Sequence, residues 1–155
     1  MMARLSPLAR DAAGTATIEL ALVAPILGAM LIGLVDISTA YSNKLRLEQV
    51  AHRTIEKVQQ SGFTTSMEAA LETEAETAAG AGSDADVTHW TECTAANGTK
   101  TTSTYTAACP GGQTFARYVQ LDIQKTHTPI ILAKFEGGNA NGTVTVHGIA
   151  GIRTQ

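Results

Sequence analysis

The chain begins with an apolar run that carries no charge from Leu20 to Val35, and Asp36 ends this run. As a helix the run is ~24 Å long, somewhat short of the ~30 Å hydrocarbon core of a membrane. Two basic residues, Arg4 and Arg10, precede it and favour a cytoplasmic N-terminus. The pattern therefore predicts a weakly favoured membrane span, with the rest of the chain outside the cytoplasm.

After the apolar run the pattern becomes amphipathic, because apolar residues recur every three or four positions over 41–60. This spacing is typical of a helix with one buried face. Neither Gly nor Pro lies between Asp36 and Gln60, whereas Ser61-Gly62 supplies a stop signal. We therefore expect one continuous helix from about Thr15 to Gln60, ~69 Å long.

A second amphipathic stretch, 64–79, predicts a shorter helix. Its predicted apolar side is formed by Met67, Ala70, Leu71, Ala75 and Ala78. Its acidic residues are interpreted mostly as a solvated face, with a metal site as the alternative: Glu68, Glu72, Glu74 and Glu76. The Gly-rich segment 80–83 then ends the helix.

From residue 84 onward, Thr-, Val- and aromatic-rich runs between turn signals predict strands over 86–93, 113–124 and 143–153. A weaker strand is expected within 99–106, and Asn97-Gly98 and Asn141-Gly142 are turn signals. The apolar segment 128–132 is expected to tuck under the sheet. These elements predict an α+β fold, in which the amphipathic half of the long N-terminal helix packs on a small antiparallel sheet. This packing covers the apolar face of the helix and the apolar face of the sheet.

Composition and charge narrow the function classes. A chain of 155 residues suits one small domain with an added segment and excludes a large two-lobed enzyme. The net charge of −3 gives no reason to expect nucleic acid as a partner. The sequence has no Gly-rich phosphate loop, G-x-S-x-G elbow or H-E-x-x-H motif, and its four histidines are scattered. We therefore expect neither catalytic residues nor a cofactor or metal.

The two cysteines, Cys93 and Cys109, lie in the strand-rich region. If this region is outside the cytoplasm, a disulfide between them is expected. By chain-entropy arithmetic, closing this loop is worth ~3 kcal/mol. A zinc site that adds His89 is the less favoured alternative, because it lacks a fourth ligand and any C-x-x-C spacing.

Three interpretations of the N-terminal segment compete. One is a secretory signal peptide with Ser38-Thr39-Ala40 as its cleavage site before Tyr41. The second is an ordinary single-pass anchor, and the third is cleavage after Gly14 with Glu19 as a functional carboxylate inside the membrane. A disposable signal peptide has no reason to share a helical register with the mature domain. The predicted continuity of the helix therefore disfavours the signal peptide.

The segment GTATIELALVAPILGAMLIGLVDISTAY resembles the TadE-like family of the tight-adherence (Flp) type IV pilus system. The resemblance rests on a basic leader, Gly14, Glu19 five residues later, Pro25, and Asp36 before Tyr41. It implies cleavage after Gly14 by a prepilin peptidase, which leaves Thr15 as the new N-terminus. It also implies a minor pilin or pseudopilin, because the major Flp pilins are much shorter chains.

In such a filament the apolar helices pack away from water, so the carboxylate of Glu19 requires a cationic partner or a proton. The α-amino group of Thr15 on a neighbouring subunit is the expected partner, and an interfacial, solvated Glu19 is the alternative. Pro25 lacks an N–H and is expected to kink the helix or loosen one turn. Asp36 is expected at the outer interface, with no chemical role.

We therefore expect a leader at 1–14, a transmembrane or filament-core helix at 15–40, its amphipathic continuation at 41–62, and a periplasmic α+β domain at 63–155. The resemblance implies four partners: a prepilin peptidase, other pilins or pseudopilins, the pilus assembly platform and the inner membrane. In the pilus the outer domain would be extracellular and available for adhesion. The alternative function is a small extracytoplasmic binding domain, either secreted with an ordinary signal peptide or anchored by a single span.

Overall fold

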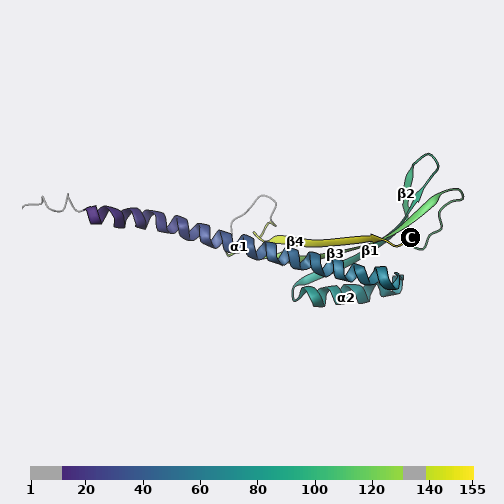
Figure 1. The fold of residues 1–155 in the computed structure, drawn as a ribbon, viewed down its shortest axis with the longest axis horizontal. Helices are drawn as coiled ribbons and strands as arrows, with labels where there is room; N and C mark the ends of the chain where they lie inside the picture. The colour runs from purple at the N-terminus through teal and green to yellow at the C-terminus, as the bar shows by residue number, and fades with distance from the viewer. Residues whose placement is uncertain (1–11, 131–138) are drawn as a thin grey trace, which may run out of the picture.

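A computed structural model describes residues 12–130 and 139–155, without the side chains of 12–16. Its elements are α1 (Ala12–Ser61), the 3₁₀ turn η2 (Thr65–Met67), α2 (Glu68–Ala79), β1 (Ser83–Thr94), β2 (Lys100–Ser103), β3 (Thr114–His127) and β4 (Val144–Arg153). The strands and α2 gather around the C-terminal half of α1, and the N-terminal half of α1 projects from them (Figure 1). This arrangement confirms the predicted α+β class.

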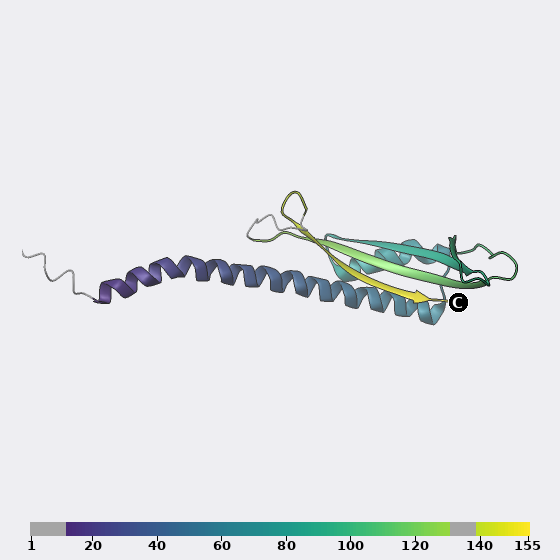
Figure 2. The same ribbon diagram turned by 90° about the horizontal axis from the view of Figure 1, so that it is seen from above.

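The long helix α1 runs without interruption through the apolar and the amphipathic segments. Its described part begins at Ala12 and so includes the predicted start at about Thr15. It ends at Ser61, where Gly62 takes a φ of +76° that suits glycine. Pro25 lies inside this continuous helix, which is bowed along its length (Figure 2). The proposed local kink at Pro25 stays a prediction.

The four strands form one antiparallel sheet in the order β2-β1-β3-β4. The three main predicted strands are present: β1 is longer than expected at both ends, β3 continues three residues further, and β4 starts one residue later, whereas the weak strand within 99–106 is reduced to β2. Gly98 and Gly142 adopt φ values of +82° and +80° at the two predicted turns. Alternate residues of β3, namely Val119, Leu121 and Ile123, are fully buried, as a one-sided sheet requires.

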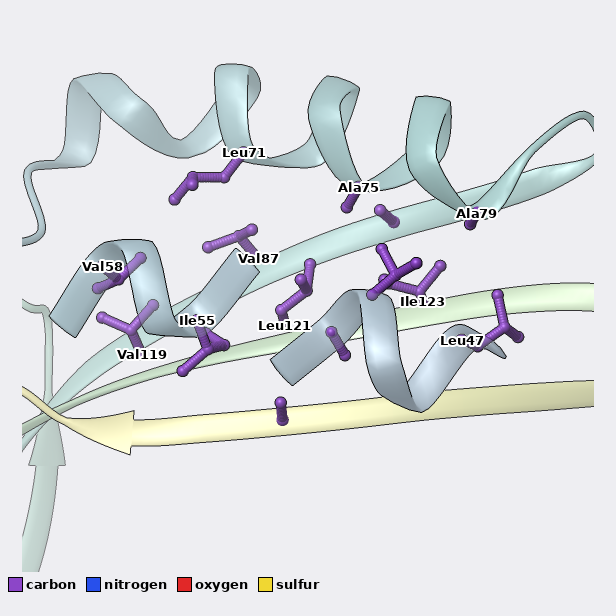
Figure 3. Close-up of a cluster of buried hydrophobic side chains, with 14 of the residues drawn as sticks. Leu47, Ile55, Val58, Leu71, Ala75, Ala79, Val87, Val119, Leu121 and Ile123 are labelled. Atoms are coloured by element: carbon purple, nitrogen blue, oxygen red, sulfur yellow. The ribbon is translucent and has the colours of Figure 1, made fainter. Parts of the chain in front are cut away.

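The core lies between the sheet and a helical layer made of α1 and α2 (Figure 3). From α2, Leu71, Ala75 and Ala79 point into it, one helical turn apart. The predicted apolar side of this helix was therefore partly wrong, because Ala70 and Ala78 are exposed. The buried stripe is rotated by about one residue, since α2 has to meet β1 as well as α1.

Helix α1 lies very close to β4 at Gly148. A Cβ atom at this position would lie 2.3 Å from the backbone carbon of Leu47 and 2.5 Å from the backbone nitrogen of Glu48. Such distances are far below van der Waals contact, so only glycine fits there without movement of the helix. Leu47 itself is the first fully buried residue of α1 and marks where the helix joins the core.

Candidate packing surface on helix α1

The N-terminal half of α1 exposes apolar side chains on all sides. From Thr17 to Arg46 no side chain of α1 is buried, and Leu20 and Leu34 are each 65% exposed. The other large apolar residues exposed in this part are Ile18, Leu22, Val23, Ile26, Leu27, Met30, Leu31, Ile32, Val35, Ile37, Tyr41 and Leu45. A continuous apolar surface of this size marks an interaction site in a monomer.

The length and composition of this surface suit a membrane. The described part of α1 contains a segment apolar enough to cross a bilayer, near the N-terminus and unburied by the rest of the chain. From Thr17 to Val35 a helix rises about 29 Å, close to the ~30 Å hydrocarbon thickness. A helix that is apolar all round requires lipid or other helices around it. The surface can therefore be satisfied either in a bilayer or in a bundle of helices.

The predicted processing site lies in the first turns of α1. Gly14 and Thr15 both have helical backbone close to the start at Ala12. Residues 1–11 lie outside the described part of the chain, and cleavage after Gly14 stays a prediction.

Glu19 projects from the apolar surface about one turn beyond Thr15, and its side chain is exposed. Within the part of the chain that the structure describes, no ion pair to Glu19 is present. A carboxylate in apolar surroundings without a partner is costly. In apolar surroundings Glu19 therefore requires a proton or a cation from outside the described residues, whereas an interfacial, solvated Glu19 requires neither, and its expected intermolecular role stays a prediction.

Asp36, for which no chemical role was expected, joins α1 to the outer domain. Both of its carboxylate oxygens accept the backbone N–H of Ile130 at 3.0 Å. Ile130 is 69% exposed, so the expectation that the apolar segment 128–132 tucks under the sheet is wrong at this residue, although Pro129 is buried. Ile131 and Leu132 lie outside the described residues. The only sequence signal for Asp36 was its place at the end of the apolar run.

Beside this contact a groove of about 500 Å³ separates α1 from the base of the sheet. Its wall on α1 consists mainly of small residues, and the opposite wall comes from the region where β3 ends and β4 begins. The lining residues are Ala29, Gly33, Asp36, Ile37, Ala40, His127, Pro129 and Val144. One side of the apolar helix is thus partly shielded by the chain's own outer domain.

The acidic side chains of α2 do more than form a solvated face. Glu72 and Glu76 accept the backbone N–H groups of Val87 and Ala85, at 3.0 and 3.3 Å. Along this stretch β1 has no neighbouring strand on its outer side, so the two carboxylates occupy donors that would otherwise remain open at the edge of the sheet. The expectation of a solvated face was wrong for these two residues.

The other two acidic residues of α2, Glu68 and Glu74, are closer to the expected solvated face. Glu74 forms an exposed ion pair with Lys57, and Glu68 lies 3.6 Å from Nδ1 of His89. Among the described residues no cluster of His, Cys, Asp and Glu suits a metal ion. The metal alternative on this helix therefore has no structural support.

Cys93 and Cys109 form a disulfide with a Cα–Cα distance of 5.6 Å. Both sulfur atoms are used in this bond, so the zinc alternative with His89 is wrong. Next to the bridge, Glu92 accepts a hydrogen bond from Lys100 on β2 at 2.9 Å. This hydrogen bond and the negative charge of Glu92 raise the pKa of Lys100 above its ordinary value. The disulfide therefore ties β1 to the segment between β2 and β3, and the ion pair ties β1 to β2.

In comparisons with known proteins, the family model described as "TadE-like protein" matches residues 14–55. The match begins at the predicted processing residue and ends in the part of α1 that packs on the sheet. It confirms the resemblance inferred from the sequence for this segment, and the family is a structural one without enzymatic activity. No curated protein and no solved structure matches the chain.

Proposed function

We propose that this chain, which is TadE-like over residues 14–55, is a minor pilin or pseudopilin required for assembly of a tight-adherence pilus. The match to the family indicates a protein associated with this pilus system. The observation that carries the finer proposal is the unburied apolar half of α1, joined without a break to a folded outer domain. A helix of this kind serves as an anchor before assembly and as a packing element afterwards.

In this proposal a prepilin peptidase cleaves the chain after Gly14, and residues 1–14 are lost as a leader. Residues 15–40 then span the inner membrane or lie in the filament core, with 41–62 as their amphipathic continuation. The domain 63–155 lies in the periplasm or, in the pilus, outside the cell. The disulfide supports this location, because disulfides persist mainly in oxidising compartments.

Glu19 has a defined part in the assembly step. Its carboxylate pairs with the new α-amino group of Thr15 on a neighbouring subunit, within a bundle of helices that excludes water. An ion pair in such surroundings is strong only when both partners are present. It therefore selects helices at the correct axial stagger, while the apolar side chains supply most of the packing area.

Two variants test the two steps separately. Gly14→Phe is expected to block cleavage, so that the accumulated protein keeps residues 1–14. Glu19→Ala is expected to be cleaved normally and to lower the yield of pili in a strain that lacks the wild-type chain. Glu56→Ala, which changes an exposed acid in the packed half of α1, is the matched control and should leave both steps intact. Normal piliation with Glu19→Ala would remove the assembly role of this carboxylate.

The second candidate function is a small extracytoplasmic binding domain that is released after cleavage before Tyr41. It draws support from the compact core, all of whose buried residues lie at or beyond Leu47. In that case residues 41–155 alone should be soluble and functional, and loss of the gene should leave pili unchanged. Cleavage before Tyr41 would, however, remove Asp36 and the contact it makes with the outer domain.

A further inference from the structure

The contact between Asp36 and Ile130 lies on the N-terminal side of the packed part of α1. Leu47 is the first buried residue of the helix, and Asp36 is ~16 Å further toward the N-terminus. Between Thr17 and Arg46 no side chain is fully buried, and only a few positions are half-buried, among them Ala40 beside the groove. A helix attached only at and beyond Leu47 would be free to change its angle to the domain.

The geometry of the contact suits a fixed attachment. The Ile130 N–H donates to both oxygens of one carboxylate at equal distances of 3.0 Å. Hydrogen bonds to an ionised acceptor are stronger than those between neutral groups. Pro129, which precedes this donor, is buried, has no N–H and restricts its own φ angle. The donor is thus presented by a stiff segment immediately after β3.

The same contact determines which side of α1 the outer domain shields. His127, Pro129 and Val144 form the domain side of the groove whose helix side contains Ala29, Gly33 and Ala40. With the contact closed, the domain lies over these small residues, and the leucine-rich remainder of the helix stays open to neighbours.

We propose that Asp36 is a positioning residue that fixes the angle between α1 and the outer domain, and that pilus assembly requires this fixed angle. The requirement for pilus assembly rests on the proposed function. The fixed angle itself is a property of the isolated chain and is tested without pili. The carboxylate acts by holding the segment after β3, and it needs no contact with a neighbouring subunit.

The test of the fixed angle uses the full-length, oxidised chain in lipid nanodiscs. Asp36→Leu removes the acceptor, Asp36→Asn keeps one neutral acceptor oxygen, and Ser38→Ala is an exposed control on the same helix. Amide hydrogen exchange at Ile130 is expected to accelerate roughly tenfold or more in Asp36→Leu, less in Asp36→Asn, and not at all in Ser38→Ala. Spin labels at residues 27 and 126 should show a broader distance distribution in the same order.

The core strands should keep their exchange protection in all three variants, which separates opening of the contact from loss of the fold. Unchanged exchange at Ile130 together with an unchanged distance distribution in Asp36→Leu would overturn the proposal. The requirement for pilus assembly is tested by piliation of cells that carry the same variants. Loss of pili in Asp36→Leu, with Thr15 still the N-terminus, supports it.

Normal piliation despite an opened contact would overturn the assembly part of the proposal. Failure of the proposed function gives a different result, namely an N-terminus at Tyr41 in the wild-type chain, which then lacks Asp36. The two failures are therefore distinguishable from the N-terminal residue alone.

Discussion

The two halves of α1 belong to one continuous helix and yet differ completely in how their apolar residues are satisfied. In the C-terminal half, Leu47 and Val58 are each 1% exposed and pack against the sheet within the same chain. In the N-terminal half, Leu20 and Leu34 are 65% exposed. The comparison shows that a segment can form a helix without being buried by its own chain. The outer domain buries apolar residues of only the C-terminal half of α1.

The substitution Leu→Ala at matched positions gives the largest expected contrast. Leu47→Ala should lower the free energy of unfolding of the outer domain by about 2–5 kcal/mol, because it leaves a cavity in the core. Leu34→Ala, the same change in the exposed half, should leave this free energy unaltered. Denaturant unfolding of the full chain in detergent, followed by the fluorescence of the single tryptophan, Trp90, measures both. Equal losses in the two variants would contradict the comparison.

Loss of the disulfide is expected to have the next largest effect, and only on the packed region. The double variant Cys93→Ser/Cys109→Ser should lose ~3 kcal/mol of unfolding free energy, since the unfolded chain regains the freedom of the loop. Helix content measured by circular dichroism under native conditions should not change. Chemical reduction of the wild-type chain serves as a control and should reproduce the loss without any substitution.

Gly148→Ala tests the close approach between α1 and β4. The added methyl group meets the backbone of Leu47 and Glu48, so the helix has to move outward, at a cost of about 1–3 kcal/mol. Gly151→Ala is the matched control on the same strand, because its nearest neighbour would be at 3.4 Å, close to ordinary contact. A shift in thermal midpoint for Gly148→Ala alone is expected, and equal shifts would show that α1 does not rest on this residue.

The smallest effect is expected from the acidic residues of α2. Glu72→Ala leaves the Val87 N–H without its acceptor and should cost about 1 kcal/mol. Glu74→Ala removes only an exposed ion pair with Lys57 and should cost about 0.5 kcal/mol or less. Parallel urea titrations resolve the difference. Indistinguishable midpoints would show that the carboxylate at the edge of β1 does not stabilise the domain.

Much of the fold was predictable because it depends on local periodicity. The spacing of three and four predicted the half of α1 that contains Leu47 and Val58, and alternation predicted the buried positions of β3. The end of α1 at Ser61 and the turns at Gly98 and Gly142 followed from the conformational freedom of glycine. The apolar surface of α1 was also predictable, because an uncharged apolar run is visible in the sequence without knowledge of what packs against it.

The contacts that join distant segments were not predictable. Asp36 and Ile130 are 94 residues apart, and no local pattern marks a backbone N–H as the partner of a carboxylate. The roles of Glu72 and Glu76 depend on which strand lies at the edge of the sheet, which periodicity does not show. Gly148 lies within the predicted strand 143–153, and nothing in the local pattern marks the approach of the helix backbone to it.

The proposed function requires that the exposed half of α1 remains in the working protein. Intact-mass and N-terminal analysis of the chain, recovered separately from membranes and from sheared pili, tests this directly. We predict Thr15 as the first residue in both fractions. A first residue of Tyr41 would mean that the apolar half is discarded, and it would contradict the account.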